Sequence, residues 1–545
     1  MGKYRVWMIV GVVLLALVAL VAWSSSQTPM VARSSETWSR GQVVGQTHVK
    51  RRVTLEVASD GSAFLVWQNM GGRLELAHVG ADGEVVPNRV LSVGTGEASD
   101  PQLQMGADGR LHLLWREGEP PDSTIHYVLL ETNGTPVGQP RTLSDPAVSV
   151  LDAPWLIAGA DGRYHVVWAD DAGIEWTMLN AEGTLIAGPT LVSAGGRFPS
   201  GQVDDRGRLH LVWQRQQRTH VEAIYYVVLD PEDAGGAVDE PVEIAQVVLR
   251  TGQGLGEPVI GLTPEMGYVF WVIRDFKYVA SAGEYALFPL GSPQQSRIEP
   301  FRLRQGRYPE GLYSSEGSRT PLLVALSESV PDPEVSDVVR AQVAVLVMGQ
   351  EGAQEQVVTA SAQASLKPVL VVDSRSNLHV AWLESTEFGR YRVVYASTAP
   401  EVMESYNALT LWDVLDVVFS NLFRLSTLIV ALVAVLIMWA VFPFLGLVVY
   451  HLITGEETLN TVRSRGALII VLAFEVALTF IQPPSIGVEA TWAALRWVAP
   501  VVGIVAATFV TARVVRRRKY IHLFTVFFLF TAINSILQMV MYFLF

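Results

Sequence analysis

The chain has no cysteine among its 545 residues. This absence excludes disulfide bridges, thiolate catalysis and metal sites built on cysteine ligands. It leaves the redox compartment open, because a chain long enough for a large hydrophobic core needs no covalent cross-links.

Positive charge is scarce in the middle of the chain. Residues 24–410 carry 29 lysines and arginines against 47 aspartates and glutamates, whereas the two ends together carry 11 against 6. An acidic domain repels phosphate backbones, so we expect no nucleic-acid partner. A local basic pocket is still compatible with this acidic background.

Charge is also missing from a long apolar run at the N-terminus. Residues 6–23 follow Lys3 and Arg5. The run exceeds the ~7–15 residues of a signal-peptide core and approaches the ~20 that cross a bilayer. We therefore predict an N-terminal transmembrane anchor over residues 1–24, with a cleaved signal peptide as the alternative.

Four more apolar runs predict a four-helix transmembrane domain over residues 425–545, preceded by an amphipathic juxtamembrane helix over 401–424. Basic clusters fall in three loops or tails, and five spans would place all three on one side. The positive-inside rule makes that side cytoplasmic. The prediction is a multi-pass protein of the cell membrane, with its N-terminus in the cytoplasm and its large domain and C-terminus outside.

A repeated string dominates the acidic domain. Each copy joins a turn containing Asp-Gly, or a variant of it, to a short apolar strand that usually ends in Trp. The copies end at residues 67, 115, 168, 213, 271, 326 and 382, the sixth with Leu in place of Trp. Intervals of 45–58 residues are typical of propeller blades.

The interior of one repeat supports a blade of four strands. In the second copy a short alternating run follows Pro101, and Asp108-Gly109 supplies a tight hairpin turn. The strand LHLLW comes next, and its apolar residues on both faces suit a sheet sandwiched between neighbours. Two further short strands complete the repeat.

Seven repeats predict an all-β propeller of about seven blades over residues 25–400, with six blades as the alternative. The last repeat shows three strands and lacks a fourth. We expect the segment Ser39–Val44 to provide that outer strand and to close the ring.

The repeat pattern resembles that of the sialidase-like (BNR-type) β-propeller superfamily over residues ~40–398. The Asp-box of that family spaces its Asp, Gly and Trp differently from the copies here. The C-terminal segment lies outside the resemblance. A sialidase-like glycoside hydrolase would bring three arginines, a Tyr/Glu pair and an acid/base Asp together. Arg116, Arg215, Arg274, Tyr225 and Tyr226 are the candidates for this site.

The residues beside each blade-opening proline predict a second kind of site. In a propeller the first strand of each blade lines the central channel, and its start faces one mouth. A ring of mixed charge and aromatics there suits a ligand. The predicted ligand-binding residues are Asp100, Asp152, Arg197, Phe198, Glu257, Arg307, Tyr308 and Lys367.

Repeated histidines occupy one strand position in different repeats. His112, His165, His210 and His379 would be set far apart by a ring, so we interpret them as structural and predict no metal and no cofactor.

Polar residues also interrupt the C-terminal apolar runs. A carboxylate in such a run is expensive and marks a candidate functional group. Glu475, Arg496, Asn534 and Gln538 form this predicted intramembrane polar cluster.

The functional prediction is a membrane-anchored, extracytoplasmic propeller that binds a glycan or protein ligand or serves as a scaffold. No recognisable catalytic set is present, so we favour binding over enzymatic activity. The alternatives are the sialidase-like hydrolase and a transport or assembly subunit with a regulatory propeller.

Overall fold

The structure is a computed structural model of the chain. It describes residues 37–94, 96–159, 161–230, 240–277, 280–301, 303, 307–315, 317–331, 339–349, 352–361, 363–386, 389–408, 411, 415, 419, 439–481, 495–518 and 520–544. One compact unit covers Ala32–Ala408, and Leu409–Phe545 belong to another.

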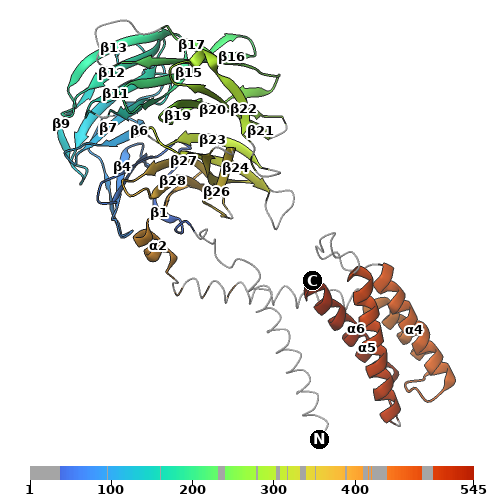
Figure 1. Cartoon of the computed structure of the whole chain (residues 1–545). Coiled ribbons are helices and arrows are strands. Elements are labelled where there is room, and N and C mark those ends of the chain that lie inside the picture. The colour runs from blue at the N-terminus through green and yellow to red at the C-terminus, as the bar shows by residue number, and fades with distance from the viewer. Residues whose placement is uncertain are drawn as a thin grey trace. The chain divides into compact units, whose positions relative to one another are not determined.

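The first unit is a seven-bladed β-propeller, with seven antiparallel sheets arranged around a central axis (Figure 1). Blades one to three follow the chain in order. Blade one is β2 (Thr54–Val57), β3 (Ala63–Gln68), β4 (Leu74–Val79) and β5 (Val85–Val90). Blade two is β6 (Ala98–Met105), β7 (Leu111–Glu117), β8 (Thr124–Leu130) and β9 (Pro136–Thr142). Blade three is β10 (Trp155–Ala158), β11 (Tyr164–Ala169), β12 (Gly173–Leu179) and β13 (Leu185–Ala194).

Blades four to six follow the same order from the axis outward, except that blade five has a divided inner strand. Blade four is β14 (Arg197–Val203), β15 (Leu209–Arg218), β16 (Val221–Leu229) and β17 (Val242–Val248). Blade five is β18 (Gln253–Leu255), β19 (Val259–Leu262), β20 (Met266–Asp275), β21 (Ala280–Pro289) and β22 (Arg297–Phe301). Blade six is β23 (Tyr308–Ser314), β24 (Leu322–Pro331), β25 (Val339–Gly349) and β26 (Gly352–Val357).

The second strand of each blade is buried on both faces. In β7 the residues from Leu111 to Arg116 are all buried, and β11 is buried along its whole length. The tryptophans that end most repeats are buried, and Trp115 and Trp213 are 0% exposed. Adjacent sheets therefore cover each other's apolar faces, as the repeats predicted. The predicted Asp-Gly turn is present as well, with Gly109 at a φ of +79° that favours glycine.

The ring closes through the two ends of the propeller sequence. Blade seven combines β27 (Ser365–Val372), β28 (Leu378–Ser385) and β29 (Tyr391–Ser397) with β1 (Gln42–Thr47), which pairs antiparallel with β29. Seven blades and this closure are confirmed, with the closing strand starting three residues later than predicted. The short helix α2 (Pro400–Asn407) follows β29, and its Asn407 side chain accepts a 2.8 Å hydrogen bond from the Arg40 backbone amide.

The predicted transmembrane bundle is wrong. Within the part of the chain that the structure describes, no helix is both long enough and apolar enough to span a bilayer. Two of the apolar runs lie in helices that also include charged residues. Arg463 and Arg465 belong to α4 (Val462–Ile481), and Arg516 and Arg517 to α5 (Leu495–Arg517). The helix α6 (Leu523–Leu544) follows α5, and residues 439–454 ahead of α4 are helical as well.

The predicted multi-pass location, with a cytoplasmic N-terminus and an extracytoplasmic domain and C-terminus, is overturned by the same finding, because it rested on those spans. The predicted anchor at residues 1–24 lies outside the described residues. The predicted juxtamembrane helix over 401–424 also falls mostly outside them, and α2 is the helix described at its start.

The repeated histidines lie inside four different blades, each hydrogen-bonded to an aromatic side chain of the next strand. His112 Nδ1 is 2.7 Å from the Tyr127 hydroxyl, and His165 Nδ1 accepts from the Trp176 indole at 3.1 Å. Burial lowers the pKa of both His112 and His165 to about 4. His112 and His165 are therefore neutral cross-links within a blade at neutral pH.

The propeller should lose stability in mild acid. Below its ordinary pKa of about 6.5 each of these histidines binds a proton in the unfolded chain. It stays neutral in the folded state until about pH 4. The free energy of unfolding should thus fall as the pH drops from 6.5 to 4, by up to roughly 3 kcal/mol per histidine. Urea unfolding followed by tryptophan fluorescence should show a smaller pH dependence for His165→Gln, whereas His48→Gln, at an exposed position, should behave like the parent.

Closure of the ring should be sensitive to the size of residue 45. A Cβ on Gly45 would lie 2.1 Å from Cζ2 of the buried Trp67 ring. Gly45→Ala should therefore lower the free energy of unfolding by about 1–3 kcal/mol, the usual cost of overpacking. Gly291→Ala, whose Cβ meets nothing within 4 Å, is the matched control. An unchanged urea midpoint for Gly45→Ala would contradict this account of the closure.

Candidate functional site

The inner strands of three blades carry the same unusual backbone conformation near the mouth of the channel. Asp100, Phe198 and Lys367 have φ values of +49°, +53° and +51°. Each precedes a proline, and in each strand the pairing register shifts at this point, as at a β-bulge. Left-handed backbone at a residue other than glycine costs roughly 1–3 kcal/mol and clusters at functional sites. The bulges also redirect side chains at the mouth of the channel.

These positions line a pocket of about 260 Å³ that is formed by six of the seven blades. Its walls combine charged side chains with a few apolar ones. The lining residues are Lys50, Arg51, Arg52, Asp100, Gln102, Arg116, Leu151, Asp152, Ala153, Trp155, Phe198, Pro199, Glu257, Pro258, Val259 and Lys367. We call it the mouth pocket.

One side of the mouth pocket is formed by an ion pair between Asp152 and Arg197. Asp152, whose side chain is 4% exposed, accepts hydrogen bonds from Arg197 Nε at 2.8 Å and Arg197 Nη2 at 2.6 Å. It also accepts one from the Phe198 backbone amide at 2.8 Å. Asp152 thereby fixes the strained Phe198 backbone and satisfies the Arg197 guanidinium, which lies 5.1 Å from the centre of the Phe198 ring.

A second ion-pair group lies between blades one and two. Asp100 is 3.1 Å from Arg51 and 2.9 Å from Arg116. Glu119 also contacts both arginines. Two carboxylates thus balance two guanidinium groups, so this part of the pocket carries little net charge.

The remaining part is rich in positive charge. Glu257 lies 3.6 Å from Arg52 and 3.8 Å from Lys367. Burial alone would raise the pKa of Glu257, but the charges of Arg52, Lys367 and Arg274 outweigh it and hold the pKa below its usual range. The pKa of Lys367 is lowered by burial and by the nearby charges of Arg52, Arg274 and Lys50, which outweigh the opposing effect of Glu257. Arg52, Arg274 and Lys367 therefore act on one carboxylate, Glu257, and Lys50 lies beside Lys367 in the same pocket. We call these four cations and Glu257 the cation cluster.

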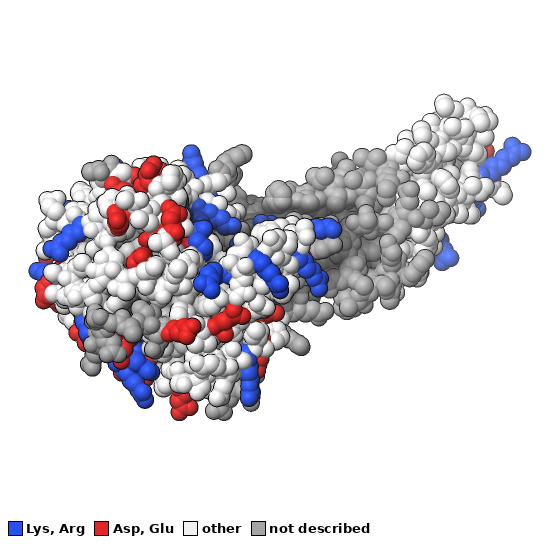
Figure 2. Space-filling model, turned by 90° about the horizontal axis from the view of Figure 1, so that it is seen from above, with Lys and Arg blue, Asp and Glu red and all other residues white. Residues whose placement is uncertain are grey.

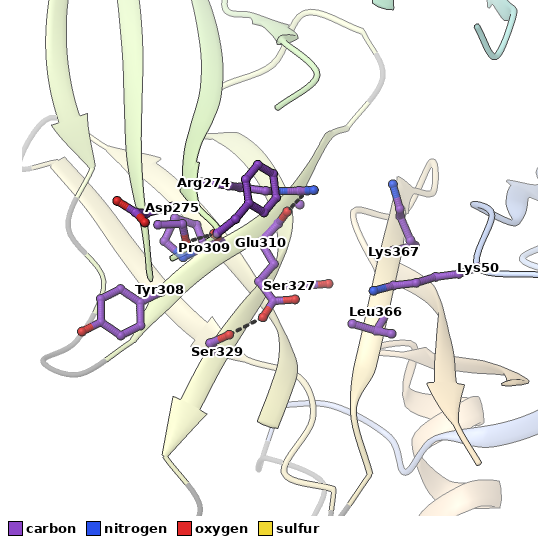
Figure 3. A pocket seen from close by; sticks show the side chains of 13 residues that line it. Lys50, Arg274, Asp275, Tyr308, Pro309, Glu310, Ser327, Ser329, Leu366 and Lys367 are labelled. Atoms are coloured by element: carbon purple, nitrogen blue, oxygen red, sulfur yellow. Dashed lines mark hydrogen bonds between the residues drawn. The ribbon is translucent and has the colours of Figure 1, made fainter. Parts of the chain in front are cut away.

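The cation cluster is a local feature. Figure 2 shows basic and acidic side chains interspersed over the visible face of the propeller, without an extended field of one sign. In Figure 3, Arg274 on one side and Lys50 and Lys367 on the other point into the same space. Lys50 is exposed and has no hydrogen bond or ion pair with any described residue.

A second pocket of about 250 Å³ adjoins the mouth pocket and shares Lys50 and Lys367 with it. It lies beside β23 and takes in the ends of neighbouring strands (Figure 3). Its other lining residues are Arg274, Asp275, Phe276, Ser281, Tyr308, Pro309, Glu310, Gly311, Ser327, Ser329 and Leu366. We call it the side pocket.

The eight residues predicted for the channel mouth are distributed unevenly. Asp100, Asp152, Phe198, Glu257 and Lys367 line the mouth pocket, and Tyr308 lines the side pocket. Arg197 contributes through its pair with Asp152. Arg307 lines neither pocket, because its Nη1 is held 2.5 Å from both Glu328 and Glu355.

Sequence reasoning missed the residues just before the first blade. Lys50, Arg51 and Arg52 supply three of the pocket's cations, and they form an uninterrupted basic run in an otherwise acidic domain. From that basic run, a cationic site could have been predicted. Its place at the channel mouth depends on the ring, which brings residue 50 next to residue 367.

The residues considered for a sialidase-like site do not gather. Arg116 lines the mouth pocket and Arg274 the side pocket, whereas Arg215 lines neither. Arg215 instead donates a 2.8 Å hydrogen bond to the Tyr225 hydroxyl and lies over that ring. The Tyr225 hydroxyl in turn donates to Glu243 at 3.4 Å. Tyr226 is buried, 2.6 Å from His210.

The polar residues of the C-terminal helices lie inside the helical unit. Glu475 of α4 is fully buried and accepts a 2.7 Å hydrogen bond from Thr531 of α6. Asn534 and Gln538, also fully buried, share a 2.8 Å hydrogen bond. Arg496 is part of α5, but its side chain lies outside the described residues. The arrangement links α4 to α6 by a buried polar contact.

The fold and the site define a β-propeller with a charged pocket at the mouth of its channel. No protein-family model matches the chain. Among solved structures, an ulvan lyase of a polysaccharide lyase family is 9% identical, covers 66% of this chain and 95% of its own, and has a TM-score of 0.45. The NanB sialidase from Streptococcus pneumoniae is 10% identical, with coverages of 69% and 71% and a TM-score of 0.35.

The propeller domain of a trilobed protease from Pyrococcus furiosus is 8% identical, with coverages of 64% and 94% and a TM-score of 0.38. Likeness at this level carries no argument about ligand or activity.

The Asp152 contact should be important for the shape of the mouth. Asp152→Asn removes a charged acceptor of three hydrogen bonds and should lower the free energy of unfolding by about 1.5–3 kcal/mol. Amide hydrogen exchange should become faster around Phe198. Asp205→Asn, on the exposed turn after β14, is the control, and equal exchange in both variants would contradict the proposed role of Asp152.

Proposed function

We propose that the propeller is a ligand-binding module that holds an anionic group of its ligand in the cation cluster. The observation that carries the proposal is the convergence of Arg52, Arg274 and Lys367 on a single carboxylate, Glu257, with Lys50 beside Lys367. These residues come from three blades. Like charges at close range repel one another, and a bound anion relieves that repulsion.

The chemistry of the cluster suits a carboxylate or sulfate group. Lysine ammonium and arginine guanidinium groups make strong, charge-assisted hydrogen bonds to both. Lys50 is exposed and has no partner among the described residues. Its ammonium group can therefore bind a ligand without first breaking a contact within the protein. Arg52 is held in place by its bond to the Leu312 carbonyl at 3.2 Å and by the Tyr313 ring beneath it.

Binding without catalysis agrees with the state of the pocket carboxylates. Glycoside hydrolysis needs a carboxylic acid that keeps its proton near neutral pH. The pKa of Glu257 is instead held below its usual range by the surrounding cations. Asp100 and Asp152 are each occupied by arginine contacts. The pocket is therefore organised to hold charge rather than to transfer a proton.

Removing one lysine charge should weaken anion binding. With glucuronate and inorganic sulfate as probes, Lys50→Gln and Lys367→Gln in the full chain should each reduce affinity about tenfold, the effect of losing ~1.4 kcal/mol. The salt dependence of binding should also decrease, because fewer charges take part. Ligand-observed NMR titration measures both quantities.

The control is Arg206→Gln, which removes an exposed charge from the turn after β14, at the far end of that strand from Arg197. It should bind both probes like the parent. Equal affinities in the parent and the two lysine variants would contradict the proposal, as would failure of the parent to bind either anion.

A further inference from the structure

The side pocket extends away from the cation cluster. Lys50 and Lys367 lie at one end of it and Tyr308 at the opposite end, with β23 running between them (Figure 3). Because the two lysines belong to both pockets, a ligand anchored on them can continue along β23. The geometry therefore suits a chain rather than a single small ion.

Two aromatic side chains border the side pocket and are open to solvent. Phe276 is 69% exposed and Tyr308 is 39% exposed. The Phe276 ring lies against Gly254, where an added Cβ would be 3.1 Å from its Cε2 atom. Exposed aromatic faces at the edge of a pocket offer apolar area and a flat surface for a ring-shaped group.

The floor between the lysines and Tyr308 is acidic and rich in hydroxyl groups. Glu310 accepts a hydrogen bond from Ser329, and Asp275 lies nearby in the same pocket. The Ser327 hydroxyl is buried and has no hydrogen-bond partner among the described residues. Carboxylates repel a second anionic group and accept hydrogen bonds from ligand hydroxyls. The side pocket therefore favours a neutral, hydroxyl-bearing ring.

Taking both pockets together, we infer that the ligand is an acidic oligosaccharide in which a charged ring is followed by a neutral one. The charged ring binds the cation cluster, and the neutral ring lies over Glu310 between Phe276 and Tyr308. This inference rests on the proposed anion-binding function and adds the class and length of the ligand. A uniform polyanion and an acidic peptide are disfavoured, because their further carboxylates would meet Glu310 and Asp275.

Four probes against the full chain test the inference. They are glucuronate, a hyaluronan tetrasaccharide in which glucuronate alternates with N-acetylglucosamine, a tetragalacturonate with every ring charged, and a tetraglutamate peptide. The hyaluronan tetrasaccharide should bind at least about tenfold more tightly than each of the others. Tyr308→Ala and Phe276→Ala should each remove most of that advantage and leave glucuronate binding unchanged, which also shows that the variants are folded.

The control is Tyr520→Ala, which removes a tyrosine that is 72% exposed in the other unit and should change nothing. Equal affinity for glucuronate and the hyaluronan tetrasaccharide would overturn the inference and leave the anion-binding function standing. Tightest binding of tetragalacturonate or tetraglutamate would overturn it in favour of a polyanion or an acidic peptide. Failure to bind any probe would refute the proposed function itself.

Discussion

The burial of both faces of every sheet is the constraint on which this propeller depends. The second strand of a blade, such as β7, is apolar on both sides, so a single blade leaves half of its apolar surface in water. Stacking the next blade against it covers that surface and creates another uncovered face. Only a closed ring leaves none uncovered, and the pairing of β1 with β29 completes it.

The same closure creates the pocket. Each inner strand begins near the channel mouth, so residues far apart in the sequence become neighbours. Glu257 and Lys367 meet there, as do Arg51 and Asp100. The bulged, left-handed residues at Asp100, Phe198 and Lys367 are strained. The ion pairs of Asp100 and Lys367, the hydrogen bond from the Phe198 amide to Asp152 and the rigid blades around them hold these residues in that conformation.

The charged side chains at the channel mouth form two kinds of group. In one kind, positive and negative charges are equal in number, and in the other, positive charge is in excess. Asp152 with Arg197, and Asp100 with its two arginines, are internally satisfied and shape the walls. The cation cluster around Glu257 keeps an excess of positive charge inside an acidic domain. At physiological salt such charges act over about 8 Å, so the local excess governs binding more than the net charge of the chain does.

The sequence by itself determined the repeat, a ring of seven or six blades, the Asp-Gly turns and the strand that closes the ring, because these depend on local periodicity and turn chemistry. It also indicated most of the residues at the channel mouth, since a repeat fixes where each inner strand begins. It did not show that Arg307 is held by Glu328 and Glu355, or that Lys50 and Arg52 join Lys367, because those contacts cross between strands and blades. In the C-terminal segment, apolar runs alone suggested membrane spans, whereas the described helices do not meet that requirement. The length of an apolar run in the sequence reflects only its average hydropathy. The tertiary structure alone decided where the helices begin and end and which charged residues they include.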